Sequence, residues 1–249
     1  MSGWVKWGMA ELSWKGLGLS IGAGIVHHAM ISCLPQDCFL CGQPAAENLL
    51  CSPCRDSLPQ LSKPRCVICA LPTPAGETCG ECLKRQPHFD FTVGSLVYGF
   101  PVDRLIQALK YTHRLAVANY LAMLMLEAGA ATGDLVMPVP LSATRLRERG
   151  FNQAVEIARP LAKRLGLPLI VDRCLRITDT APQASLPWKE RRKNIRDAFE
   201  CRIDLSGKHV IVVDDVMTTG ATLDEFAQTL KKHGAASVTN WVAARTLRN

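Results

Sequence analysis

The sequence predicts an α/β protein in which a mostly parallel sheet follows a small cysteine-rich module. From residue 91 onward, strand-like and helix-like patterns alternate along the chain. The run at 210–213 is wholly apolar, which is typical of a strand buried on both faces. Eight of the eleven cysteines form four Cys-x-x-Cys pairs before residue 91, a spacing that favours metal binding over disulfides. We therefore expect a poorly defined leader at 1–34, a double zinc ribbon at 35–88 and an α/β domain at 89–249.

The leader is rich in glycine and tryptophan, and its role stays open between an amphipathic surface segment and a loosely ordered extension. Its apolar run at 17–26 is interrupted by glycines and is too short to cross a bilayer. No cleavable signal peptide is recognisable. These features predict a cytoplasmic protein without a membrane span.

The cysteines form an internal repeat. Cys38-x2-Cys41 is followed after nine residues by Cys51-x2-Cys54, and the same unit recurs from Cys66 to Cys82. Two such knuckles complete a tetrahedral site of four thiolates with no open position, so we expect two structural zinc ions. An iron–sulfur cluster is the rival metal centre. The expected ligands are Cys38, Cys41, Cys51, Cys54, Cys66, Cys69, Cys79 and Cys82.

The pairing of the knuckles is left open by the spacing. Sequence order favours one site for each repeat, but a cross-braced arrangement, in which the first knuckle pairs with the third, also fits the spacing. Cys33, Cys174 and Cys201 stand outside the repeat. We expect them to be buried small hydrophobic residues.

Apolar periodicity predicts the elements of the α/β domain in order. We expect strands at 91–98, 134–139, 169–175, 210–213 and 236–243. We expect helices at 102–111, 115–128, 152–165 and 221–233, and a basic helix or turn at 187–195. Alternation of this kind favours a parallel sheet covered by helices on both faces.

The formal net charge of +7 lies entirely in the α/β domain. Residues 1–90 hold seven basic and seven acidic residues, whereas residues 91–249 hold twenty-two and fifteen. An excess of this kind favours an anionic ligand such as a phosphate compound or a nucleic acid, with solubility as the simpler explanation.

The segment 210–222 carries the most specific chemistry. Its apolar strand ends at Asp214 and Asp215, and a loop of small residues at 218–222 then opens into a helix. Ligands of open α/β sheets bind at this end of a strand, where backbone N–H groups and the helix dipole favour a phosphate. The two carboxylates are suited to ribose hydroxyls. The loop lacks the Gly-Lys-Ser/Thr of a Walker A motif and the three glycines of a dinucleotide fingerprint.

These thirteen residues resemble the motif that binds phosphoribosyl pyrophosphate (PRPP) in type I phosphoribosyltransferases. The resemblance implies that PRPP binds together with Mg²⁺, and that residues 136–141 supply the loop for its pyrophosphate. The implied PRPP contacts are Asp214, Asp215, Met217, Thr218, Thr219, Gly220, Ala221, Thr222, Pro140, Leu141 and Arg149.

Further blocks resemble the ComF family of competence-associated proteins. They are Arg145-x-Arg147-x-Arg149-Gly150-Phe151-Asn152-Gln153, the pair Lys110-Tyr111, and the set Gln183, Arg191, Arg192 and Asn194. In that family a double zinc ribbon precedes a phosphoribosyltransferase domain, and the match extends over residues 35–245. The resemblance implies a role in DNA uptake during natural transformation.

Type I transferases join a nitrogen nucleophile to the anomeric carbon of PRPP and expel pyrophosphate. The resemblance implies a flexible cationic loop that closes over the pyrophosphate, and we expect Arg145, Arg147 and Arg149 on it, with Gly150 as a hinge. The implied catalytic residues are Asp214, Asp215 and Arg147; alternatively, the arginines only meet solvent. Purine transferases often carry aspartate where this chain has Thr218, which disfavours purine salvage. The acceptor, turnover and oligomeric state stay open.

The competing hypothesis is a non-catalytic adaptor. In it the zinc ribbon contacts a competence helicase or recombination protein, and a basic surface binds single-stranded DNA. Lys189, Arg192, Lys193 and Arg196 are spaced for one side of a helix, although Trp188 is the one aromatic residue there for base stacking. An adaptor needs neither adjacent carboxylates nor a phosphate loop, so their presence favours PRPP binding.

Overall fold

A computed structural model describes residues 36–45, 48–178 and 195–247. The strands are β1 Phe91–Val97, β2 Leu135–Pro138, β3 Cys174–Arg176, β4 Phe199–Cys201, β5 His209–Met217 and β6 Ser237–Arg245. The helices are α2 Ser52–Asp56, α3 Gly80–Lys84, α4 Val102–Thr112, α5 Ala116–Ala128, α6 Ala143–Arg149, α7 Gln153–Leu165 and α9 Ala221–Lys232. Among these described helices, none is both long and apolar enough to span a membrane.

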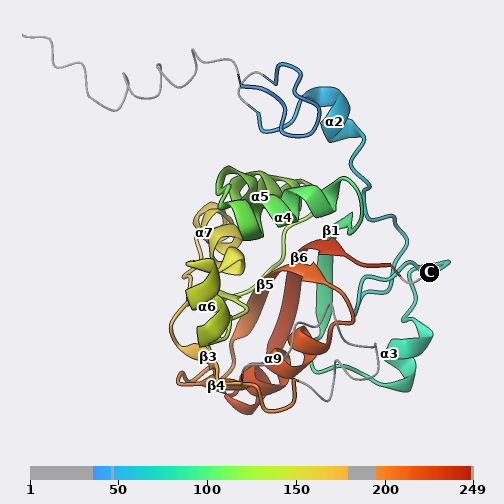
Figure 1. Cartoon of the computed structure of the whole chain (residues 1–249). Helices are drawn as coiled ribbons and strands as arrows, with labels where there is room; N and C mark the ends of the chain where they lie inside the picture. Colours follow the sequence, from blue (N-terminus) through green and yellow to red (C-terminus); the bar gives the residue numbers. More distant parts are fainter. Residues whose placement is uncertain (1–35, 46–47, 179–194, 248–249) are drawn as a thin grey trace, which may run out of the picture.

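The main sheet has four strands in the order β1-β6-β5-β2, and every neighbouring pair is parallel (Figure 1). Strand β5 lies inside the sheet, so its apolar residues are buried from both faces. Ile211 and Val213 pack with α4, α5 and α7, whereas Val210 and Val212 pack with α9. This two-residue alternation explains why the run is wholly apolar. The predicted α/β class is confirmed.

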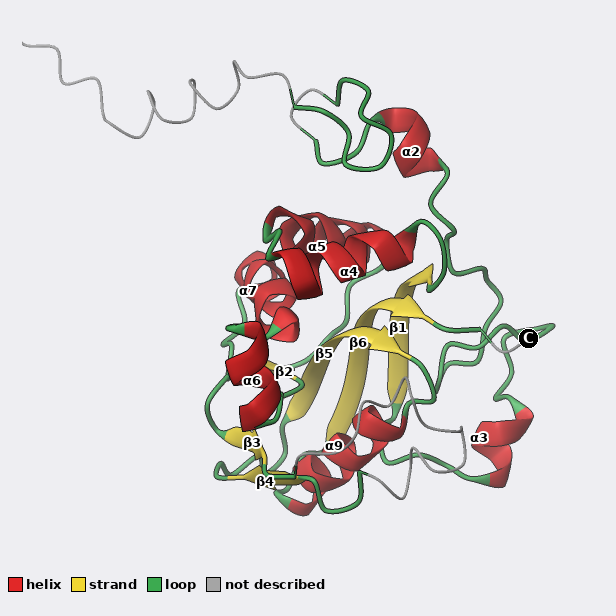
Figure 2. Ribbon diagram, viewed as in Figure 1, coloured by secondary structure: helices red, strands yellow, loops and turns green. Residues whose placement is uncertain are grey.

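Helices cover both faces of the sheet, with α4, α5 and α7 on one face and α9 on the other (Figure 2). The outer edge of β1 is covered by the chain that joins the two cysteine repeats. There Leu61 N–H donates to the carbonyl of Ser95 at 2.9 Å, and Val97 N–H donates to the carbonyl of Pro59 at 2.8 Å. This pairing covers the carboxyl-end part of that strand edge.

The two cysteine repeats pack on different sides of the sheet. Cys38, Leu50 and Leu58 of the first repeat belong to the core formed by α4 and α5. Cys66 and Cys82 of the second repeat belong to the opposite core, together with residues of α9. The first repeat lies above α5 in Figure 1, and the second lies beside β1 near α3. Both repeats therefore share their cores with the α/β domain.

The predicted strand at 169–175 is wrong in its extent. Leu169 makes a single parallel bridge to Val136, and the regular strand is β3, which pairs antiparallel with the unpredicted strand β4. Cys174 and Cys201 are buried, as predicted, but they lie directly opposite each other and form a disulfide, so the expectation that they stand alone is wrong. Opposite residues approach most closely at a non-hydrogen-bonded position of an antiparallel pair, which brings the two sulfurs within bonding reach.

The cationic loop predicted around Arg145 is instead helix α6. The helix begins after Ser142, whose side chain accepts a hydrogen bond from Arg145 N–H at 3.5 Å. It ends at Gly150, which has φ +78° and donates its N–H to the carbonyl of Leu146 at 2.8 Å. Gly150 is thus a left-handed C-cap, the position where glycine is preferred. The predicted loop is therefore wrong, whereas closure over a pyrophosphate with Gly150 as the hinge stays a prediction. The basic segment predicted at 187–195 falls outside the described residues, except for Ile195.

Trp241 offers a test of the core. It is 0 % exposed in β6, and its indole N–H has no hydrogen-bond partner among the described residues. We expect Trp241→Ala to lower the free energy of unfolding by about 3–5 kcal/mol, as for other large aromatic truncations. Trp241→Phe should lower it by less than half as much, because it keeps a ring and removes an unsatisfied donor. Urea unfolding measures the free energy of unfolding of both variants. Equal losses in Trp241→Ala and Trp241→Phe would mean that the indole N–H has an essential partner.

Candidate functional site

The candidate site lies at the carboxyl ends of β5 and β2. Asp214 and Asp215 stand near the end of β5, and the chain after β2 runs beside them. Val139 N–H donates to the carbonyl of Val213 at 2.9 Å. The Val139 carbonyl in turn accepts from Asn152 Nδ2 at 2.9 Å. These bonds hold the predicted pyrophosphate loop, with Pro140 and Leu141, next to the two carboxylates.

Asp215 is 3 % exposed and is held by two side chains from different helices. Lys110 Nζ, near the end of α4, forms an ion pair with Asp215 Oδ2. Gln153 Nε2, at the beginning of α7, donates to Asp215 Oδ1 at 3.0 Å. Neither residue was predicted to contact the carboxylates. Both residues lie in blocks that resemble the ComF family, which was the signal available from the sequence.

The two adjacent carboxyl groups have opposite pKa shifts. Burial alone would raise the pKa of Asp215, but the charge of Lys110 and hydrogen bonds from Lys110 and Gln153 outweigh burial and hold that pKa below its usual range. Burial and the charge of Asp215 raise the pKa of Asp214 well above its usual range, against the attraction of Lys110. The pair therefore ionises in two steps, with Asp215 first.

The loop after β5 has the form that the sequence predicts. Gly220 has φ +81°, and a Cβ there would lie 2.7 Å from Met217 Cε, so the position requires glycine. Thr219 Oγ1 accepts a hydrogen bond from Ala221 N–H at 3.1 Å at the start of α9. The loop Thr218–Thr222 thus lies at the positive end of a twelve-residue helix, an arrangement suited to phosphate. Met217 is buried below the loop, so its side chain supports the loop from the core.

A cationic cavity of about 280 Å³ lies beside Lys110. Its lining residues are Lys110, Tyr111, His113, Arg145, Glu148 and Arg149. Arg145 and Arg149 are one helical turn apart and share a face of α6. Arg149 donates to Gln153 Oε1, and Gln153 bonds Asp215. A continuous chain of polar contacts thus joins the cavity to the carboxylates.

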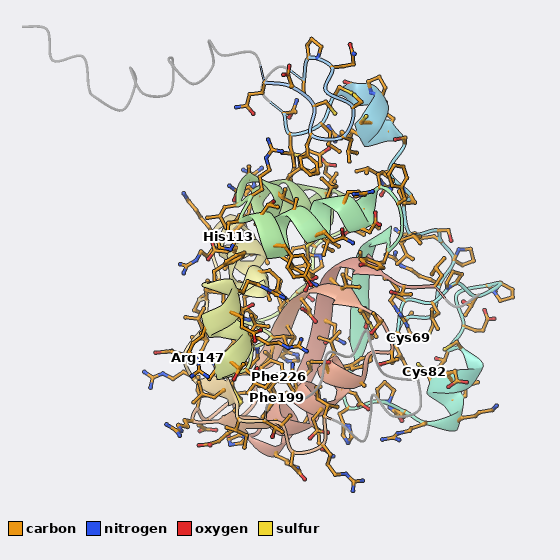
Figure 3. The ribbon with its side chains drawn as sticks, in the orientation of Figure 1. Cys69, Cys82, His113, Arg147, Phe199 and Phe226 are labelled. Atoms are coloured by element: carbon orange, nitrogen blue, oxygen red, sulfur yellow. A yellow bond between two sulfur atoms is a disulfide. The ribbon has the colours of Figure 1, made fainter. Side chains whose placement is uncertain are left out.

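Arg147 lies on another side of α6. Its side chain is exposed and donates to Thr144 Oγ1 at 3.2 Å, and Figure 3 shows it at the outer side of the helix. Among the described residues, those that line the cavity include both neighbouring arginines but not Arg147. Its catalytic role stays a prediction, and the helical geometry favours Arg145 and Arg149 instead.

Each cysteine repeat forms one cluster of four sulfurs. The sulfurs of Cys38, Cys41, Cys51 and Cys54 lie within 4.8 Å of one another, and so do those of Cys66, Cys69, Cys79 and Cys82. Cys41 Sγ is 3.6 Å from Cys51 Sγ, and Cys69 Sγ is 3.5 Å from Cys79 Sγ. Tetrahedral zinc with Zn–S bonds of about 2.3 Å places its ligand sulfurs about 3.8 Å apart. The clusters fit zinc, with one site for each repeat; a cross-braced pairing is excluded.

A cation is needed for all four thiols of a cluster to ionise. Burial opposes ionisation of Cys38, but backbone hydrogen bonds from Cys51, Cys41 and Leu40 lower its pKa to about 6. Hydrogen bonding to Cys41, together with burial, raises the pKa of Cys54 to about 12. Bound zinc removes this conflict because it stabilises all four thiolates.

We expect the purified protein to carry two zinc ions per chain, one for each cluster, because both sets of sulfurs are closed around a tetrahedral centre. Elemental analysis by mass spectrometry measures the content. Iron in place of zinc, or one metal ion per chain, would contradict the two-site assignment.

Lys110 and Asp214 should have opposite effects on stability. Lys110→Met leaves the Asp215 charge buried without its partner and should lower the free energy of unfolding by about 3–5 kcal/mol at neutral pH. Asp214→Asn should raise it, because the folded state no longer holds two adjacent carboxylates. Urea unfolding from pH 3 to 8 measures both.

The pH dependence fixes the sign of each effect. The lowered pKa of Asp215 means that its stabilisation exists above the unfolded-state pKa of about 4 and is lost as pH falls. The raised pKa of Asp214 means that stability is lost as pH rises above that value. Both variants should therefore approach the wild type in acid. A difference that stays constant over this range would show that the carboxyl groups are not responsible.

The remaining predicted residues are not placed. Gln183, Arg191, Arg192 and Asn194 of the family resemblance fall outside the described residues, as do Lys189 and Lys193 of the basic surface. Arg196, the last residue of that surface, is described and is exposed.

Comparison with known proteins finds family models for both parts of the chain and relatives that match most of its length. A model of the double zinc ribbon domain matches residues 30–83, and a model of the phosphoribosyl transferase domain matches residues 152–247. The chain is 37% identical over 227 residues to the DNA utilization protein YhgH of Salmonella typhi, covering 86% of this chain and 99% of the relative. It is 33% identical over 212 residues to competence protein F of Haemophilus influenzae, covering 80% and 92%. A purine phosphoribosyltransferase structure from Pyrococcus horikoshii is 23% identical, covers 60% of this chain and 74% of that chain, and has a TM-score of 0.28.

The phosphoribosyl transferase match covers β5, β6 and the loop Thr218–Thr222, called here the phosphate-type loop, and the zinc ribbon match covers the two four-cysteine clusters. The sequence relatives extend over most of this chain and nearly all of their own length. The chain therefore belongs to the ComF family of competence-associated proteins, which combine a double zinc ribbon with a phosphoribosyltransferase domain.

Proposed function

We propose that this protein binds PRPP with Mg²⁺ at the carboxyl edge of its sheet and acts in DNA uptake. One observation carries the PRPP part of the proposal. A phosphate-type loop, a pair of carboxyl groups and a cationic cavity lie along one edge. Contacts that run from Lys110 through Asp215 and Gln153 to Arg149 connect the carboxyl groups to the cavity. This order matches the order of groups in PRPP, which carries a phosphate, a ribose and a pyrophosphate.

Each part of the edge suits one part of the ligand. The loop Thr218–Thr222 would hold the 5′-phosphate through backbone N–H groups and hydroxyls. Asp214 and Asp215 would accept hydrogen bonds from the ribose hydroxyls. The pyrophosphate would lie between the Pro140–Leu141 segment and the cavity, where Arg145 and Arg149 supply positive charge.

The charge of the free site favours an anion despite the two acidic residues. Asp214 has a raised pKa, and the charge of Asp215 is neutralised by Lys110. In the part of the chain that the structure describes, the lining of the cavity holds Arg145 and Arg149, with Glu148 as its one acidic residue, which favours an anion there. Oxygen atoms of the carboxylates and of PRPP are suitable ligands for Mg²⁺, which would neutralise charge on the pyrophosphate when bound.

Phosphoribosyl transfer is the reaction that such a complex supports. A nitrogen nucleophile would form a bond to the anomeric carbon, and the bond to pyrophosphate would break with the electron pair leaving on the pyrophosphate oxygen. Arg145 and Arg149 are placed to stabilise that charge. Thr218, where purine transferases often carry aspartate, argues for an acceptor other than a free purine base.

The role in DNA uptake is supported by the relatives, which are named as competence and DNA utilization proteins. The basic excess of the α/β domain is compatible with contact to a DNA backbone. The alternative function is a non-catalytic adaptor that binds single-stranded DNA or a helicase and keeps the PRPP site.

Calorimetric titration of PRPP with Mg²⁺ tests the proposal on four proteins. The wild type should bind, and Asp214→Asn should weaken binding about tenfold or more by replacing a carboxyl acceptor with an amide while leaving the Lys110–Asp215 pair in place. Arg145→Ala should weaken binding to a similar degree. Arg147→Ala, on the same helix but outside the cavity, serves as the matched control and should change it little.

The outcomes separate the alternatives. A folded, zinc-replete wild type that does not bind PRPP would overturn the proposal and leave the adaptor hypothesis, which salt-dependent binding of single-stranded DNA would then support. An Arg147→Ala variant that loses as much affinity as Arg145→Ala would restore the predicted role of Arg147.

A further inference from the structure

Arg245 is a buried arginine that contacts two parts of the protein far apart in sequence. It is the last residue of β6 and is 2 % exposed. Its Nε donates to the carbonyl of Cys69 at 2.9 Å. Its Nη1 donates to the carbonyl of Met217 at 3.0 Å and also to that of Thr218. A fork of fixed geometry such as guanidinium holds several acceptors in one arrangement.

The carbonyl groups that Arg245 contacts belong to functional segments. Cys69 is a ligand residue of the second cysteine cluster. Met217 ends β5, and Thr218 begins the phosphate-type loop. One side chain thus joins the metal knuckle directly to the loop. Figure 3 shows Cys69 and Cys82 close together on the side of the sheet where α3 lies.

The chain that leaves the second cluster makes two more contacts to the same region. Phe89 is buried, and its ring lies 3.7 Å from the position that a Cβ on Gly220 would occupy. His88 N–H donates to Asp224 Oδ1 at 2.8 Å, and His88 Nδ1 lies 2.9 Å from the same oxygen. Asp224 is in the first turn of α9. The second repeat and the chain after it are therefore linked to the loop in three ways. The links are Arg245, the ring of Phe89, and the contact of His88 with α9, the helix that follows the loop.

The first cluster is attached elsewhere. Arg55 lies in α2, directly after Cys54, the last cysteine of the first cluster. It forms an ion pair with Glu127 of α5 at 2.8 Å. Arg114 lies over the ring of Phe39 at 4.8 Å. These contacts are to the helical layer on the other face of the sheet, so the two clusters have similar chemistry and different neighbours.

We propose that zinc at the Cys66–Cys82 cluster holds the phosphate loop in its binding conformation through Arg245, and that zinc at the Cys38–Cys54 cluster does not. Arg245 is then a positioning residue. Release of the second metal frees the Cys66–Cys69 knuckle, and the Cys69 carbonyl no longer fixes one side of the guanidinium. The effect on PRPP rests on the proposed function; the effect on the loop does not.

Hydrogen–deuterium exchange on the full chain tests the coupling with matched variants. Cys79→Ser and Cys51→Ser change the third cysteine of each repeat, and both residues are partly exposed. Zinc analysis should show loss of one ion in each. Cys79→Ser should speed exchange at residues 217–224 about tenfold or more, whereas Cys51→Ser should leave that exchange as in the wild type.

Arg245→Lys isolates the link from the metal. Lysine keeps the charge but cannot span the Cys69 carbonyl and the loop with one planar group. We expect both zinc ions to remain bound while exchange at 217–224 rises about tenfold. Circular dichroism and a cooperative urea transition establish that each variant is folded. If Cys79→Ser alone fails to fold, Arg245→Lys carries the comparison.

PRPP titration of the same proteins keeps this inference distinct from the proposed function. Weaker PRPP binding in Cys79→Ser and Arg245→Lys, with wild-type binding in Cys51→Ser, supports both. If the loop exchanges faster in Cys79→Ser and Arg245→Lys but none of the proteins binds PRPP, PRPP is overturned as the ligand and the coupling is retained. Equal loop exchange in Cys79→Ser and Cys51→Ser, or an unchanged loop in Arg245→Lys, would overturn the coupling.

Discussion

The buried carboxylate at the end of β5 needs polar partners from other parts of the chain. Asp215 is buried there, and an ionised carboxylate removed from water requires close polar partners. Lys110 comes from the end of α4 and Gln153 from the start of α7. The contact that stabilises the carboxylate therefore also fixes how these two helices meet the sheet. Because Gln153 also contacts Arg149, the position of α6 and its cavity depends on the same carboxylate.

The neighbouring Asp214 shows a conflict between stability and binding. Two adjacent carboxyl groups repel each other in the folded protein, and burial together with this repulsion raises the pKa of Asp214. An apolar or amide side chain there would suit the folded chain better. Retention of such a residue is typical of a site shaped for a ligand, where local stability is lower than it could be.

The sequence predicted the parts of the molecule that depend on local pattern. The apolar run at 210–213, the small-residue loop at 218–222 and the repeated cysteine spacing are each visible in the sequence alone, and the sheet, loop and metal clusters follow from them. Lys110 and Gln153 could not be assigned to Asp215, because their contact depends on how α4 and α7 pack. Helix α6 was missed because three alternating arginines gave no apolar stripe. Strand β4 was missed because three residues are too few to show a period.

The bond between Cys174 and Cys201 has a consequence for how the chain is held together. It joins positions 27 residues apart, on either side of the stretch 179–194. A protease that cuts once between the two cysteines would leave an N-terminal piece with both metal clusters and a C-terminal piece with β5, α9 and β6. The disulfide would keep the two pieces as one covalent molecule. The strand that carries the carboxylates would then separate from the clusters on a denaturing gel only after reduction.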